Sequence, residues 1–190
     1  DLIGLAPTAG ELASFRAEFA TDKRAALESL VDRLLATPQF GERWGRHWLD
    51  VARYGESNGN DGLGRNPTFP NAWRYRDYVI RSFNEDKPYD RFVMEQIAGD
   101  ELTDVDNDSL IATGFYRLGV WDDEPDDPRA AEFEALDDMV KTTSETFMGL
   151  TVGCARCHDH KYDPVSAEDY YALYGIMQST KWAFPGGEEQ

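Results

Sequence analysis

The sequence predicts a mostly α-helical fold, an irregular multi-helix domain with long loops. Apolar residues recur every three to four positions along most of the chain, and residues that start or stop helices bracket these stretches. Alternating apolar and polar runs, which would indicate strands, are scarce. With 190 residues, 41% hydrophobic and 13% aromatic, the chain is expected to form a single domain over residues 1–190 with a buried core.

The first three helices are predicted from a capping pattern and two apolar stripes. Thr8 and Glu11 form a capping box before a helix over about residues 9–19. A stripe that begins at Leu27 predicts a second helix, which Pro38 stops. A third stripe predicts a helix over about residues 40–54, and its members are Phe40, Trp44, His47, Trp48 and Val51. Because His47 belongs to this stripe, we expect it to face the core.

The remaining helices are bracketed by start and stop residues, and we expect them over about residues 71–83, 89–98, 110–118, 128–149 and beyond Ser166. Asn71 and Ser166 are the expected N-caps, and Gly99 is an expected C-terminal stop. Residues 55–70 are rich in glycine and asparagine, and residues 122–128 are acidic and contain proline. Both segments are predicted to be loops.

The charge of the chain restricts its partners. Its 36 acidic and 19 basic residues leave a net charge of −17. Such a charge repels phosphate backbones and anionic membrane surfaces, so nucleic acid is excluded as a partner and a basic protein or a small ligand is favoured. No apolar run approaches the roughly 18–20 residues that a membrane span needs.

Both cysteines of the chain lie in one short motif. Cys154 and Cys157 are separated by two residues and are followed at once by His158, which is the attachment signature of c-type haem. Two thiols one turn apart suit the two vinyl groups of a porphyrin, and the adjacent imidazole suits the iron. The motif therefore predicts one covalent haem c, with His158 as an iron ligand.

Two other interpretations of this motif remain open. A reactive dithiol is one, although no βαβ pattern surrounds the cysteines. A zinc site formed by Cys154, Cys157, His158 and His160 is the other. The four candidate ligands are crowded into one arm, whereas structural zinc sites usually draw ligands from two separated arms, so the spacing favours haem.

The sixth iron position decides between an electron carrier and a catalyst. His47 is the favoured ligand, with Trp44 and Trp48 flanking it as ring surfaces for the porphyrin. His160 lies two residues from His158 and points about 200° away on a helix, so we expect it to bind a haem propionate or a backbone group. Met177 and an open or water-bound iron are the alternatives to His47.

Five blocks of the sequence share one resemblance, and they are residues 41–54, 71–80, 83–92, 96–102 and 149–164. Together they resemble the planctomycete-specific c-type cytochrome domain of the second type, a domain of unknown function. The resemblance covers about residues 26–180. It implies a haem module excised from a larger secreted or periplasmic protein, whose other domains would be partners of this one.

We therefore expect an extracytoplasmic electron-transfer domain that passes single electrons to a basic redox partner, rather than a self-standing enzyme. A haem-dependent oxidoreductase with an open iron near residues 55–70 is the first alternative. A zinc-stabilised interaction module without redox activity is the second.

Overall fold

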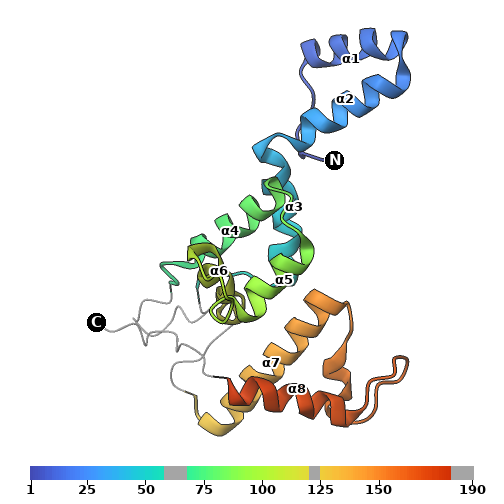
Figure 1. Cartoon of the computed structure of the whole chain (residues 1–190). Helices are drawn as coiled ribbons and strands as arrows, with labels where there is room; N and C mark the ends of the chain where they lie inside the picture. Colours follow the sequence, from blue (N-terminus) through green and yellow to red (C-terminus); the bar gives the residue numbers. More distant parts are fainter. Residues whose placement is uncertain (58–67, 120–124, 181–190) are drawn as a thin grey trace.

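The computed structural model describes residues 1–57, 68–119 and 125–180 (Figure 1). Within these ranges the chain is helical, and the only bridge between extended residues joins Ser57 to Thr68. The α-helices are α1 (Ala9–Thr21), α2 (Lys23–Leu35), α3 (Pro38–Val51), α4 (Ala72–Asn84), α5 (Tyr89–Ala98), α6 (Asn107–Ala112), α7 (Pro128–Met148) and α8 (Ala167–Ser179). Two 3₁₀ helices, η1 (Thr113–Arg117) and η2 (Val152–Arg156), complete them. The predicted mostly α-helical class is confirmed.

Thr8, Asn71 and Ser166 are N-caps as predicted, but only Thr8 and Ser166 make a capping hydrogen bond. Thr8 accepts from the backbone N–H of Glu11, and Ser166 accepts from that of Asp169, each within a complete capping box. Asn71 precedes α4 but makes no capping bond, because its side chain accepts from Arg74 instead. Its backbone ψ of 0° is also unlike the extended conformation of a usual N-cap.

Other helix boundaries differ from the predicted ones. Pro38 occupies the first turn of α3, where its missing N–H costs nothing, and α3 ends at Val51 rather than at residue 54. The helix expected over residues 110–118 is α6 followed by η1. Of the two predicted loops, residues 58–67 and 122–124 lie outside the described residues.

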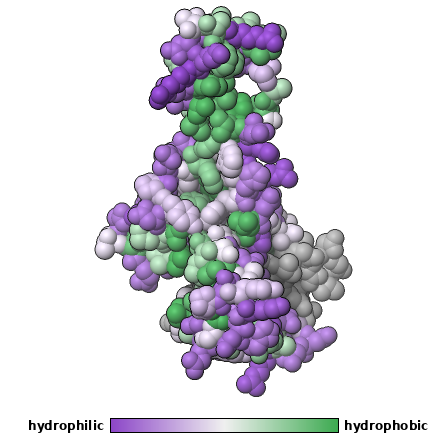
Figure 2. Space-filling model, turned by 90° about the vertical axis from the view of Figure 1, so that its right-hand side faces the viewer, coloured by the Kyte–Doolittle hydropathy of each residue, from purple (hydrophilic) through white to green (hydrophobic). Residues whose placement is uncertain are grey.

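The described helices form three groups along the chain (Figure 1). The hairpin of α1 and α2 stands away from the rest, α3 to α6 with η1 form the central group, and α7, η2 and α8 form the third. Hydrophobic residues gather on the exposed surface of the hairpin (Figure 2). They include Leu12, Leu27, Val31 and Leu35, which are all exposed, whereas Leu30 and Leu34 of the α2 stripe are half-buried.

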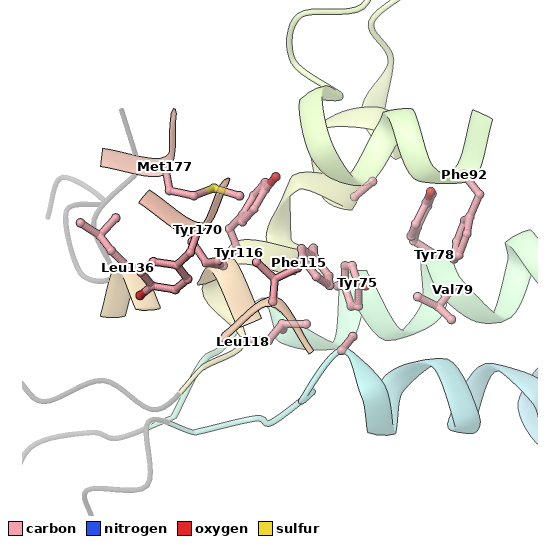
Figure 3. Packing of buried hydrophobic residues seen from close by; sticks show 14 of the residues in the cluster. Tyr75, Tyr78, Val79, Phe92, Phe115, Tyr116, Leu118, Leu136, Tyr170 and Met177 are labelled. Atoms are coloured by element: carbon pink, nitrogen blue, oxygen red, sulfur yellow. The ribbon is translucent and has the colours of Figure 1, made fainter. Parts of the chain in front are cut away.

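Aromatic side chains from the central and third groups share one core (Figure 3). Tyr78 of α4 stacks on Phe92 of α5 at 5.7 Å between ring centroids, and Phe115 of η1 lies 4.9 Å from Phe147 of α7. Met177 of α8 is buried in the same core. The third group is therefore packed against the central one through apolar rings.

Polar contacts reinforce this junction. Arg53 has a φ of +53°, which is uncommon for a residue with a side chain. Its Nε donates to Asp138 Oδ2 of α7 at 2.6 Å, and its Nη1 donates to the carbonyl of Phe115 at 3.3 Å. Thr146 of α7 donates to the carbonyl of Val51 at 3.0 Å. The strained backbone of Arg53 thus directs a half-buried cation to two other segments.

Glu95 carries a buried charge, and this predicts a dependence of stability on pH. Its carboxylate is 2% exposed and accepts from Tyr78, Lys87 and Arg91 at 2.8, 2.6 and 2.7 Å. Burial alone would raise the pKa of Glu95, but the hydrogen bonds from Lys87, Arg91 and Tyr78 outweigh it and hold the pKa below its ordinary 4.5. The stabilisation is therefore complete above the unfolded pKa and is lost as pH falls through the lower folded one.

We expect the free energy of unfolding to be level near neutral pH and to fall below about pH 4.5. Glu95→Gln should lower it by about 2 kcal/mol at pH 7 and should flatten part of the acid slope. Urea unfolding between pH 3 and pH 7 measures both effects. An acid slope that is the same in the Glu95→Gln protein would contradict the assigned pKa shift.

Candidate functional site

The motif residues lie on η2, directly after α7. Gly149 ends α7 in the left-handed conformation with φ of +66°, and the N–H of Leu150 returns to the carbonyl of Ser144 at 3.2 Å. The chain then enters η2, which packs against both α7 and α8. Val152 and Ala155 are buried at 3% and 0% exposure. These two residues are the anchoring side of η2.

The two cysteines lie on the solvent side of this turn. Cys154 and Cys157 are exposed, and both are free thiols. A 3₁₀ helix has three residues per turn, so side chains at positions i and i+3 eclipse one another. Since η2 ends at Arg156 and Cys157 is its C-cap, the backbone places both thiols on the same side. The arrangement suits any partner that must engage the two sulfur atoms together.

His158 follows the turn and keeps one ring nitrogen available. Its Nδ1 lies 2.7 Å from the carbonyl oxygen of Asp159. A carbonyl only accepts, so Nδ1 carries the proton, and in the neutral ring the Nε2 lone pair is the one left for a ligand. Asp159 is held in turn, because its carboxylate accepts from the N–H of Ala167 at 2.9 Å at the start of α8. The exposed imidazole of His158 therefore has a defined tautomer.

His160 uses both ring nitrogens for contacts within the chain. The N–H groups of Asp163 and Tyr162 donate to its Nδ1 at 2.9 and 3.3 Å. The proton must then be on Nε2, which lies 3.0 Å from the hydroxyl of Thr151. The side chain is only 6% exposed. His160 thus ties the loop after the cysteines to the segment before them.

His47 does not face the core, so that prediction is wrong. It is exposed on α3, while the buried side of this helix is made by Gly41 and Gly45. Because Gly45 and His47 are two residues apart, they point about 200° away from each other. The close packing of α3 on α4 requires small residues at positions 41 and 45, so the glycine side of α3 is buried instead of the side that carries His47. His47 has no hydrogen-bond partner among the described residues.

The two tryptophans beside His47 are separated by the structure. Trp44 is 38% exposed, and its ring lies edge-on to that of His47 at 5.6 Å. Trp48 turns inward, where its indole N–H reaches the hydroxyl of Tyr75 at 3.2 Å and the amide oxygen of Gln96 at 3.0 Å. Trp44 and His47 therefore share a surface, whereas Trp48 belongs to the core.

The arrangement gives little support to the zinc alternative. Among residues 1–57, 68–119 and 125–180, no three His, Cys, Asp or Glu side chains are grouped to hold a metal ion. His160, the fourth candidate ligand, has both nitrogens engaged. The glycine-rich segment of the enzyme alternative falls largely on residues 58–67, outside the described residues.

A buried charge cluster lies directly behind the cysteines, and sequence reasoning did not find it. Asp137 of α7 is 4% exposed and accepts from Lys141 at 2.6 Å, from Arg156 at 3.1 Å and from the hydroxyl of Tyr170. Burial alone would raise the pKa of Asp137, but the bonds from Lys141 and Tyr170 and the charges of Lys141 and Arg156 hold it below its ordinary value. The only sequence signal was an Asp137–Lys141 pair four residues apart, beside the inward Leu136.

Comparison with known proteins gives one family. A family model described as PSCyt2, protein of unknown function (DUF1549), matches residues 1–182. No curated protein and no solved structure was found to match the chain. In the part of the chain that the structure describes, no helix has the length and apolar character needed to span a membrane.

Proposed function

The chain belongs to the PSCyt2 family, whose function is unknown, and on that premise we propose that it is a covalent haem c-binding domain that transfers electrons. The observation that carries this proposal is the imidazole of His158. Its Nδ1–H is bound to the carbonyl of Asp159, which leaves Nε2 as a ligand on an exposed ring. A hydrogen bond of this kind orients a metal-binding histidine and strengthens it as a ligand.

The donor set fits haem c. Cys154 and Cys157 would hold the porphyrin through two thioether bonds, and both thiols are free, exposed and on one side of η2. His158 would be the proximal ligand. Haem c supplies an iron that gains and loses one electron. The residues of this chain would hold the group, and the bond to the carbonyl of Asp159 would orient the ring of His158.

We propose that His47 would supply the second iron ligand. Its exposed imidazole has unoccupied nitrogens, and the ring of Trp44 beside it offers an apolar surface. Met177 is the less suitable ligand, because it is buried in the core between α7 and α8. An iron left open on that side would instead support a haem-dependent oxidoreductase.

The rest of the proposal concerns the setting of the domain. Haem is attached to such motifs outside the cytoplasm, so we place the chain in the periplasm or among secreted proteins. With a net charge of −17, it would dock a basic redox partner or basic parts of its parent protein.

Expression in a periplasm with haem-attachment machinery tests the proposal. We expect a red protein whose mass exceeds that of the chain by one haem and whose colour survives acid–organic extraction. A Cys154→Ser, Cys157→Ser protein should lose all covalent haem. His160→Ala is the matched control and should keep it, since Thr151 and the backbone of the loop already engage both ring nitrogens of His160. A colourless wild-type protein that holds zinc would refute the proposal.

A further inference from the structure

We infer that Asp137 is a positioning residue, which orients the two thiols by holding Arg156, the residue that precedes Cys157. Asp137 touches neither cysteine. Its buried Oδ2 accepts from Arg156 Nη1 at 3.1 Å, across the interface between α7 and η2. The direct link between Asp137 and the segment that carries the thiols is therefore its bond to Arg156.

Arg156 is fixed at three points. Besides the contact with Asp137, its guanidinium carbon lies 4.5 Å from the ring centroid of Phe133 on α7. Its backbone carbonyl accepts from the hydroxyl of Tyr171 on α8 at 3.1 Å. The side chain is thus held by one helix and the main chain by the other. Because these contacts restrain the backbone between the thiols, they restrain the direction of both sulfur atoms.

Asp137 is itself held firmly enough to act as an anchor. Lys141, one turn later on α7, donates to the same Oδ2 at 2.6 Å, and the fully buried Tyr170 of α8 donates to Oδ1. The stem of Lys141 also lies against Gly153, where an added Cβ would come within 2.4 Å of Lys141 Cγ. The cluster therefore supports η2 along its length.

The inference rests on the proposed function only in one respect, namely that the two thiols bind haem. In the haem-free chain the same orientation determines how readily the two thiols meet. Three residues of 3₁₀ helix advance about 6 Å, which lies within the roughly 4.4–6.8 Å between the Cα atoms of disulfide-bonded cysteines. A firmly held turn should therefore favour the disulfide, and a loosened turn should favour it less.

The test is the thiol–disulfide equilibrium of the full, haem-free chain against glutathione. In this reaction Cys154 and Cys157 are oxidised to a disulfide while one glutathione disulfide is reduced to two thiols. We expect Asp137→Asn and Arg156→Met each to lower the equilibrium constant by roughly three- to tenfold, the usual scale of coupling between residues in contact. The equilibrium constant of the double variant should be no lower than that of the more affected single variant, because both changes break the same Asp137–Arg156 contact.

Glu95→Gln is the matched control. Glu95 is also a buried carboxylate that binds one tyrosine and two cations, but it lies on α5 in the central group. The variant should lose stability in the same way as Asp137→Asn and should leave the thiol equilibrium unchanged. This comparison separates an effect on the turn from a general loss of stability.

A thiol equilibrium that stays at the wild-type value in Asp137→Asn and Arg156→Met would overturn the inference. If these variants fail to fold, Tyr171→Phe decides instead, because it keeps the half-exposed ring and removes only the hydroxyl that donates to the Arg156 carbonyl. Tyr171→Phe should lower the equilibrium constant for disulfide formation by about twofold. An equilibrium constant equal to that of the wild type would overturn the inference. A shifted equilibrium in a chain that takes up no haem would refute the proposed function and leave the role of Asp137 intact.

Discussion

Gly41→Ala is expected to lower the free energy of unfolding by about 2–3 kcal/mol, because α3 meets the backbone of α4 at this point. A Cβ on Gly41 would lie 2.3 Å from the carbonyl oxygen of Ile80 and 2.6 Å from the amide of Asn84. That amide accepts from the N–H of Gly41 and donates to the carbonyl of Pro38, so it caps the first turn of α3 from outside. The methyl group would disturb both the packing and the cap.

Gly45→Ala, one turn later on the same face, is the control. Its Cβ would make ordinary contacts with the side chains of Ile80 and Val79 at 3.4 and 3.5 Å. We expect its stability to change by less than about 1 kcal/mol, since alanine also improves helix propensity. Thermal unfolding should separate the two variants by roughly 5 °C or more. Equal melting temperatures would show that α3 and α4 do not approach each other as closely as the structure places them.

His47→Ala is expected to convert the haem-loaded protein from low spin to high spin. The covalent haem should remain, because Cys154, Cys157 and His158 are unchanged. The ferric iron should become high-spin or take up water, its potential should rise, and carbon monoxide should bind the ferrous form much faster. Optical spectra and stopped-flow binding measure these changes.

A second histidine variant, His160→Ala, is the control for this prediction. His160→Ala should leave the spectrum low-spin, because the ring nitrogens of His160 bind Thr151 and the backbone of the loop. A low-spin spectrum that survives His47→Ala would place the ligand elsewhere, with Met177 the next residue to replace. A wild-type protein that is already high-spin would favour the oxidoreductase over the carrier.

The elements of the fold were largely predictable, because their signals are local. The capping boxes at Thr8 and Ser166 and the proline at the start of α7 each fix a helix end through neighbouring residues. The orientation of α3 was not predictable from its own stripe. Which side of a helix is buried depends on the element that packs against it. In this protein α4 packs against the side of α3 that carries Gly41 and Gly45.

Part of the candidate site was likewise predictable from the sequence, and part of it depends on the packing of the helices. Cys154, Cys157 and His158 form a contiguous motif, so the sequence identifies them without a fold. The partners of Arg156 come from residues 133, 137 and 171, which only the packing of α7, η2 and α8 brings together. The free Nε2 of His158 likewise depends on a backbone bond whose geometry no residue pattern specifies.

The contacts that join α7 to the central helices also bear on the order of folding. Arg53 and Asp138 are 85 residues apart in the chain, and Val51 and Thr146 are 95 apart, whereas α1 with α2 and α7 with α8 are near neighbours. Contacts between distant residues close large loops and form slowly, while local helical pairs form early. We therefore expect the segment that carries both thiols to reach its final position late in folding, after its own helices have formed.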